Sequence, residues 1–201
     1  MISKALNLIL SQINQYIEPV AGADEAVLGN VALNEAPDQN ALKNKVILSL
    51  VNVEEESTMK NTLNFRKMGA GVNYQEPPVN LNLYLLFAAH YPLAYDTSLK
   101  RLSDVIRFFQ HRKKFSINTA SPLPDTLDPN DPDDIELYLT AELYTMTFEQ
   151  INHLWGSLGG KQMPFVMYKF RLVMIRDRKI YGQGGIIEEI QNNLLANTDA
   201  C

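Results

Sequence analysis

One stretch of the sequence, residues 77–91 (PPVNLNLYLLFAAHY), limits the fold more than any other. Its apolar side chains recur at every second position, at Val79, Leu81, Leu83, Leu85 and Phe87. The positions between them hold Asn80, Asn82, Tyr84 and Leu86. This period of two predicts a β-strand with one well-buried face and one mixed face. Because prolines cannot donate ladder hydrogen bonds, we expect pairing to begin just after Pro78.

A second apolar stretch, residues 46–53 (VILSLVNV), is rich in Val, Ile and Leu on both of its faces. That composition is typical of a strand that is covered on both sides. We therefore expect these two strands to form the middle of one sheet. Shorter or alternating apolar patterns predict further strands at residues 27–33, 115–118, 135–145 and 165–175.

Three segments carry apolar residues at helical spacing. Residues 2–18 predict an amphipathic helix that Pro19 ends. Residues 99–114 predict a second helix, capped by Asp96, Thr97 or Ser98. Its expected buried stripe is Leu99, Leu102, Val105, Ile106 and Phe109.

Thr147 and Gln150 have the spacing of a capping box and open a third, short helix, which Gly159 and Gly160 are expected to stop. Residues 186–195 fit a final strand or a helix. Together the patterns predict one α/β (α+β) domain over residues 1–195, with a mixed, mainly antiparallel sheet flanked by helices. Residues 196–201 are expected to be a frayed tail.

Residues 57–76 show no clear period and include Gly69 and Gly71. A connection of this length in a compact domain is unusual and often functional. It fits a long hairpin extension, a mobile arm or a disordered surface loop. Its apolar residues are more numerous than a solvated loop needs.

The sequence lacks the common catalytic and metal-binding motifs. His90, His111 and His153 lie on different predicted elements, without the spacing of a zinc site. The glycine-rich residues 69–71 and 182–185 match no phosphate-binding loop and are expected to be turns. The aspartate-rich residues 121–134 lack the glycine of a calcium loop and are interrupted by prolines. We therefore expect no catalytic residue, no cofactor, no metal and no enzyme activity.

Composition excludes two kinds of partner. The net charge of −5 argues against a general nucleic-acid binder, which needs a basic surface. The apolar runs are much shorter than the ~20 residues that cross a membrane, and no signal peptide is expected. The only cysteine is Cys201. Synthesis in a reducing cytoplasm is the expectation.

Charge is distributed in blocks. Residues 100–114 hold six bases and one acid, residues 125–136 hold six acids and no base, and residues 169–179 hold five bases and one acid. Opposite blocks on one surface can meet head to tail between copies of the chain, and such a contact closes into a ring if the rotation permits. The alternative is that each block is only a solvated face.

Four segments occur in one order: residues 44–57 (NKVILSLVNVEEES), 77–91, 99–110 (LKRLSDVIRFFQ) and 151–175 (INHLWGSLGGKQMPFVMYKFRLVMI). Together they resemble the tail-terminator, or cap, proteins of phage-tail-like contractile injection systems. That family includes terminators of toxin-delivering particles related to the antifeeding prophage and the Photorhabdus virulence cassette. The resemblance covers about residues 1–190.

The resemblance implies an α/β subunit that forms a homohexameric ring at the end of the particle distal to the baseplate. The ring would sit on the last layer of inner tube, engage the last layer of sheath and anchor sheath to tube during contraction. Such a protein joins a particle that can leave the cell, and it can give or accept a strand at a sheet edge. Other hypotheses are a baseplate or tube-completion adaptor, and an enzyme or small-ligand domain.

The expected interface comprises three parts. They are the arm at residues 57–76, the basic face of the helix at residues 99–114, and the acidic loop at residues 121–134. Its residues are Met59, Phe65, Arg66, Lys67, Met68, Arg107, Arg112, Lys113, Lys114, Asp131, Asp133 and Asp134.

Overall fold

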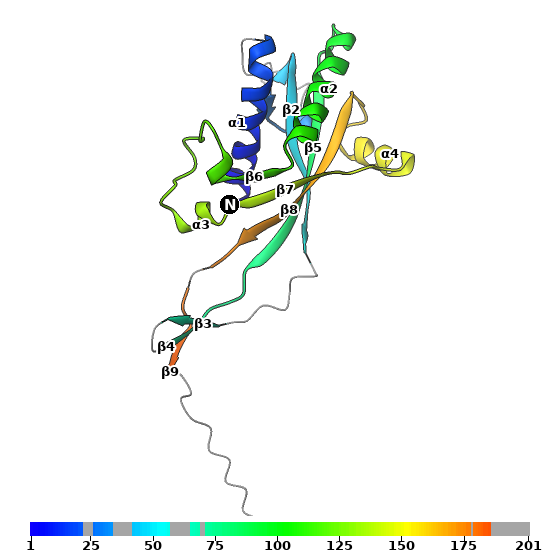
Figure 1. The fold of residues 1–201 in the computed structure, drawn as a ribbon. Helices are drawn as coiled ribbons and strands as arrows, with labels where there is room; N and C mark the ends of the chain where they lie inside the picture. The colour runs from blue at the N-terminus through cyan, green and yellow to red at the C-terminus, as the bar shows by residue number, and fades with distance from the viewer. Residues whose placement is uncertain (22–25, 34–41, 57–64, 69–70, 178, 186–201) are drawn as a thin grey trace, which may run out of the picture. The chain divides into compact units, whose positions relative to one another are not determined.

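The computed structural model describes residues 1–21, 26–33, 42–56, 65–68, 71–177 and 179–185 (Figure 1). The chain divides into two compact units. The larger is made of Met1–Lys60 and Val79–Ile175, and the smaller of Asn61–Pro78 and Arg176–Cys201.

The larger unit contains a six-stranded sheet in the order β1-β2-β5-β8-β7-β6. All of its neighbours pair antiparallel except β1 and β2, which pair parallel. The strands are β1 (Ala26–Leu28), β2 (Lys45–Glu55), β5 (Val79–His90), β6 (Lys114–Ser116), β7 (Tyr138–Leu143) and β8 (Phe165–Ile175). The helices are α1 (Ile2–Ala21), α2 (Tyr95–His111), α3 (Pro132–Ile135) and α4 (Phe148–Ser157), with short 3-10 turns η1 (Val31–Leu33) and η4 (Ile117–Thr119). The mixed, mainly antiparallel α/β fold is confirmed.

The predicted strand at residues 77–91 is β5, and it begins at Val79, directly after the two prolines. It lies in the middle of the sheet with β8, whereas β2 is second from the edge. The expectation that β2 is a central strand is therefore wrong. The pairing of β2 with β5 is confirmed.

Both faces of β5 are buried, not one. Leu83, Leu85 and Phe87 pack in a core with α1 and α2. Leu86 and Ala88 pack in a second core with Trp155 of α4. The helices thus cover opposite faces of the sheet (Figure 1). The face predicted to be mixed is therefore buried under α4, which the sequence pattern of β5 does not reveal.

Two β-bulges change the alternation of the long strands. One extra residue lies in β2 between Leu50 and Asn52, and another in β8 opposite the step from Leu81 to Leu83. Regular alternation along residues 165–175 would place Val173 on the opposite side from Phe170, but both are fully buried in the same core. The extra residue reverses the facing of every side chain beyond it.

The helix boundaries differ from the predicted ones. Helix α1 continues through Pro19 to Ala21, so Pro19 does not end it. A proline this close to the C-terminal end removes only one hydrogen bond of the helix. The helix tolerates this loss because a long apolar stripe of α1 is buried in the core.

Helix α2 starts earlier than predicted, with Ala94 as its N-cap and no side-chain cap, and it ends before Lys113. Phe108 is buried and Ile106 is exposed, because the ring of Phe108 packs against Tyr16 and Phe115. The predicted buried stripe was wrong at Leu99 and Ile106, which are both exposed.

Helix α4 begins as predicted. Thr147 N–H donates to Gln150 Oε1 at 3.0 Å, and Gln150 N–H donates to Thr147 Oγ1 at 3.3 Å. Gly159 and Gly160 follow the helix with φ of 102° and 79°. Glycine takes this left-handed region at no steric cost, which is why the helix stops there.

The smaller unit contains a three-stranded antiparallel sheet in the order β3-β4-β9. Its strands are β3 (Phe65–Met68), β4 (Gly71–Tyr74) and β9 (Gly182–Gly185). Within the predicted arm, β3 and β4 pair antiparallel, while residues 57–64 and 69–70 lie outside the described residues. Gly182–Gly185 is a strand, not the predicted turn. A Cβ at Gly184 would lie 3.3 Å from the Tyr74 ring, so glycine lets this ring cover the strand.

Candidate interaction surfaces

The described part of the chain offers little catalytic chemistry. No group of three or more His, Cys, Asp or Glu is placed there to hold a metal ion. His111 and His153 are exposed, and the nearest acid to His153 is Glu149 at 3.7 Å. Among the described helices, none has the length and apolarity to cross a bilayer.

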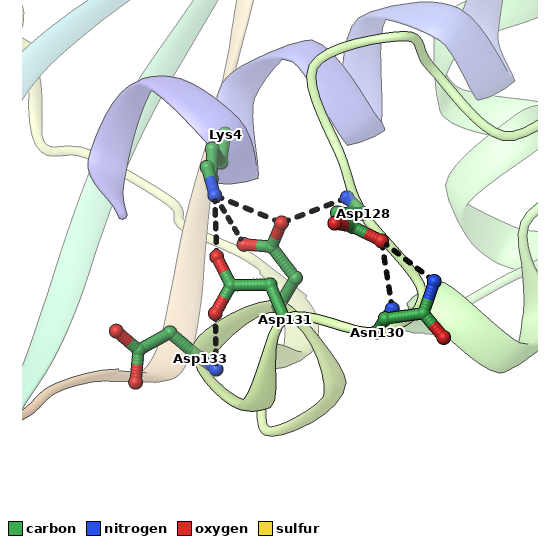
Figure 2. Close-up of polar contacts among 6 residues, drawn as sticks. Lys4, Asp128, Asn130, Asp131 and Asp133 are labelled. Carbon is green, nitrogen blue, oxygen red and sulfur yellow. Dashed lines mark hydrogen bonds and ion pairs between the residues drawn. The ribbon is translucent and has the colours of Figure 1, made fainter.

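The acidic loop is tied to helix α1 by an ion pair (Figure 2). Lys4 Nζ lies 2.8 Å from both carboxylate oxygens of Asp134 and 3.2 Å from Asp131 Oδ2. The hydrogen bond to Asp134 is the largest of the effects that raise the pKa of Lys4 above its usual value. Asp134 is fully buried, so this carboxylate acts inside the chain.

Asp128, Asp131 and Asp134 also accept hydrogen bonds from the backbone of the loop. Asp128 N–H donates to Asp134 Oδ2 at 2.9 Å, and Asn130 N–H donates to Asp128 Oδ1 at 2.8 Å (Figure 2). Asp131 caps α3 by accepting from Asp133 N–H at 3.0 Å. Of the three loop residues predicted for the interface, Asp131 and Asp134 thus bind within the chain, and Asp133 is partly buried.

The basic face of α2 carries its own counter-ions. Arg107 and Arg101 each lie 3.5 Å from Asp104, and Lys100 lies 2.6 Å from Asp96. Pairs at this spacing on an exposed helix contribute little to stability. Arg107, predicted for the interface, is the most exposed partner of Asp104.

The basic residues after α2 are arranged differently. Arg112 donates to Gln12 Oε1 and to the carbonyl oxygen of Thr119, and its guanidinium carbon lies 5.7 Å from the centre of the Phe115 ring. Lys113 and Lys114 are exposed. No local pattern indicates the contact of Arg112 with Gln12, which is 100 residues away on α1.

A pocket of about 460 Å³ lies between α1 and α2. It is lined by Gln12, Gln15, Tyr16, Phe108, His111 and Arg112. The rings of Tyr16 and Phe108 are 5.6 Å apart, and Gln12 is 2% exposed. The pocket therefore combines an aromatic wall with buried and charged polar groups.

The predicted arm residues Phe65, Arg66, Lys67 and Met68 form β3, an edge strand of the small sheet. Met59 lies outside the described residues.

In the larger unit, β1 pairs with β2 only at Val46, Ile47 and Leu48. Beyond these residues no described strand pairs with that side of β2, and Leu50 and Val53 are 37% and 40% exposed. An edge of this kind can accept a strand from a partner.

A polar cluster lies near the end of β2, which sequence reasoning did not find. The Tyr84 hydroxyl donates to Glu54 Oε2 at 2.8 Å, and Lys169 Nζ lies 5.5 Å from the centre of the Tyr84 ring. Burial, and then the contact with Glu54, raises the pKa of Tyr84 to about 12. Asn82 donates to Glu56 at 2.9 Å, while its buried Oδ1 has no hydrogen-bond partner among the described residues. The only sequence signal was the polar character of alternate positions in β5.

These features define a mixed α/β protein whose exposed chemistry is that of interaction surfaces. Residues 5–189 match the family model described as the Pvc16 N-terminal domain, so the chain belongs to the Pvc16 N-terminal domain family. This agrees with the resemblance found in the sequence. None of the curated proteins matches the sequence.

Two solved structures have a similar fold. The PVC sheath/tube terminator of an extracellular contractile injection system, in its extended state, matches with a TM-score of 0.62 and 8% identity over 100% of this chain. The tube-terminating cap of the anti-feeding prophage matches with a TM-score of 0.60 and 12% identity over 94% of this chain. This chain spans 65% and 60% of the lengths of those two chains.

Proposed function

We propose that this chain is a cap subunit of an extracellular, contractile, phage-tail-like particle. Six copies form a ring that ends the inner tube and the sheath and anchors sheath to tube. The observation that carries the proposal is the family match over residues 5–189, supported by a fold shared with two terminators. In this proposal the two units work as one terminator domain in a particle that delivers toxin.

The character of the described surface supports a structural role, not an enzymatic one. Three of the predicted basic interface residues, Arg112, Lys113 and Lys114, are consecutive and have no ion pair within the described residues. The partners are further copies of the chain, the tube protein and the sheath protein. Neither nucleic acid nor membrane is a partner.

The free edge of β2 is the proposed attachment point for an extended segment of sheath. Strand addition uses backbone hydrogen bonds for affinity and alternate side chains for specificity. Leu50 and Val53 supply apolar contacts at this edge, and Glu54 and Glu55 supply negative charge. A segment that alternates apolar and basic residues would complement it.

Deletion of the gene in the producing strain tests the proposal. We expect tubes of uncontrolled length and sheaths that detach on purification, both visible by negative-stain microscopy. Expression of the gene from a plasmid should restore normal length. Particles of normal length with firmly held sheath in the deletion strain would overturn it.

The position of the protein on the particle discriminates between a cap and an adaptor. A gold-labelled tagged copy should be found at the end opposite the tail fibres. Label at the baseplate end would instead support a baseplate or tube-completion adaptor.

A further inference from the structure

Arg112 holds a positive charge that no described carboxylate neutralises. Its hydrogen bonds go to two neutral acceptors, the side-chain oxygen of Gln12 and the main-chain oxygen of Thr119. Its remaining contact is with the ring of Phe115. These contacts fix the position of the guanidinium. The end of α2 adds only the partial negative charge of a helix C-terminus.

Five other cations of the larger unit, Lys4, Lys100, Arg101, Arg107 and Arg171, have an acid beside them. Among the described residues, ion pairs within 3.5 Å join Lys4 to Asp134, Lys100 to Asp96, and Arg171 to Glu142. Arg112 is followed by two exposed lysines, and none of the three makes an ion pair with a described residue. A fixed guanidinium without a counter-ion is well suited to bind a carboxylate, because its donors form a rigid planar fork.

The pocket beside Arg112 has an apolar wall as well, which a ligand would have to cover. Its volume of about 460 Å³ is in the range of sites that hold a ligand. Tyr16 and Phe108 form an aromatic wall, while Gln15 and His111 offer polar groups at the same pocket. A small inorganic anion would leave the aromatic wall uncovered. A ligand with a carboxylate next to an apolar side chain would use both parts.

We propose that this pocket between α1 and α2 is the docking site for an acidic segment of a different polypeptide. A Glu or Asp of that segment pairs with Arg112, and a neighbouring apolar side chain covers Tyr16 and Phe108. The acidic loop of a second copy is a poor occupant, since its Asp131 and Asp134 are bound to Lys4. The inference rests on the proposed function, in which the segment belongs to another protein of the particle.

A displayed library of random 12-residue peptides, selected on the full-length protein, tests the pocket without particles. We expect selected peptides to contain Asp or Glu beside an apolar residue. The best peptide, made synthetically, should bind at least about tenfold more weakly to Arg112→Gln, because truncating one member of a desolvated charge pair is costly. Binding should also weaken as salt is raised.

Gln15→Glu serves as a second variant, because Gln15 lines the pocket and a carboxylate there adds a negative charge that repels an acidic segment. It should also weaken binding, while Lys43→Gln, which removes an exposed charge elsewhere, should not. Thermal unfolding of each variant checks that it is folded.

Several results would overturn the inference. These are failure to select any peptide, peptides without acid enrichment, or equal binding by wild type, Arg112→Gln and Gln15→Glu. Inorganic sulfate, or a single-stranded oligonucleotide, competing as well as the free peptide would also overturn it. None of these outcomes bears on the gene-deletion experiment, so failure of the docking site and failure of the cap role can be distinguished.

Discussion

Lys4 Nζ lies 2.8 Å from both carboxylate oxygens of Asp134, a fully buried residue 130 positions away in the sequence. The pair joins the first turn of α1 to the one-turn helix α3. Through the bond from Asp128 N–H, it also sets the path of the aspartate-rich loop. A loop with four prolines and five aspartates therefore has a defined conformation.

The ion pair gives the first prediction. Asp134→Ala should lower the free energy of unfolding by about 1–3 kcal/mol, since it leaves the Asp128 N–H without its acceptor and Lys4 with only Asp131. The double variant Lys4→Met, Asp134→Asn should lose less free energy of unfolding than the two single variants lose together. Each single variant leaves one charged or polar group without its partner, whereas the double variant removes both. Urea unfolding measures all four proteins of this cycle.

Lys100→Met is the matched control, because it breaks an exposed pair with Asp96 on α2. It should leave stability nearly unchanged. If the Lys4 and Asp134 changes were additive, the two residues would not be coupled in solution.

The second prediction concerns alkaline pH. Burial and Glu54 raise the pKa of Tyr84 from 10.0 to about 12. The folded chain therefore binds the phenol proton more tightly than the unfolded chain does. The resulting stabilisation is fully present below pH 10 and is lost as the pH rises through 12. Tyr84→Phe should reduce the fall in stability over this window.

Urea midpoints measured from pH 9 to 12, roughly the span over which tyrosine and lysine titrate, test this prediction. Lys4 also has a raised pKa and loses its contribution in the same direction. The difference between wild type and Tyr84→Phe isolates the tyrosine. Identical pH dependence of the two proteins would show that burial and the contact with Glu54 do not raise the pKa of Tyr84 in solution.

The third prediction concerns Trp155, which packs against Phe165 at 5.3 Å between ring centres. Trp155→Ala should lower the free energy of unfolding by about 3–5 kcal/mol, because it opens a cavity in the core beneath α4. Trp155→Phe should cost much less. The indole N–H is buried without a hydrogen-bond partner among the described residues, so its removal breaks no bond. A Trp155→Phe protein as unstable as Trp155→Ala would point to an unseen partner for that N–H.

Local patterns explain what the sequence could predict. The period of two in residues 165–175 gives both ends of β8, because β-strand alternation is a property of neighbouring residues. The capping box at Thr147 was found for the same reason, since both partners lie in one turn. The bulge in β8 was missed, and with it the facing of Val173, because an extra residue is set by the partner strand.

Contacts between distant segments explain what could not be predicted at the candidate surfaces. Charge blocks were evident in the sequence, but Asp134 is buried by Lys4, and Arg112 is held by Gln12. Neither contact has a local signature. Charge alone therefore overestimated how many acids of the loop are available to a partner, while it correctly singled out Lys113 and Lys114 as exposed.

The fourth prediction tests the basic residues after α2 as a ring contact. Lys113→Glu combined with Lys114→Glu should weaken ring assembly and leave the monomer folded, because both side chains are exposed. Light scattering after size-exclusion chromatography measures the assembly. Lys43→Glu, an exposed lysine elsewhere, is the control. Unchanged assembly of the double variant would remove these two lysines from the contact.

The fifth prediction tests the free edge of β2. Leu50→Lys with Val53→Lys should leave the fold intact, because both side chains are exposed, but should hinder strand addition by placing charge on the edge. Particles carrying this variant should lose sheath on purification, as counted by negative-stain microscopy. Leu99→Lys with Ile106→Lys changes two exposed apolar residues of α2 and should have no such effect. Equal sheath retention by both variants would exclude the β2 edge as the attachment point, while the cap role would still depend on the length of the tubes.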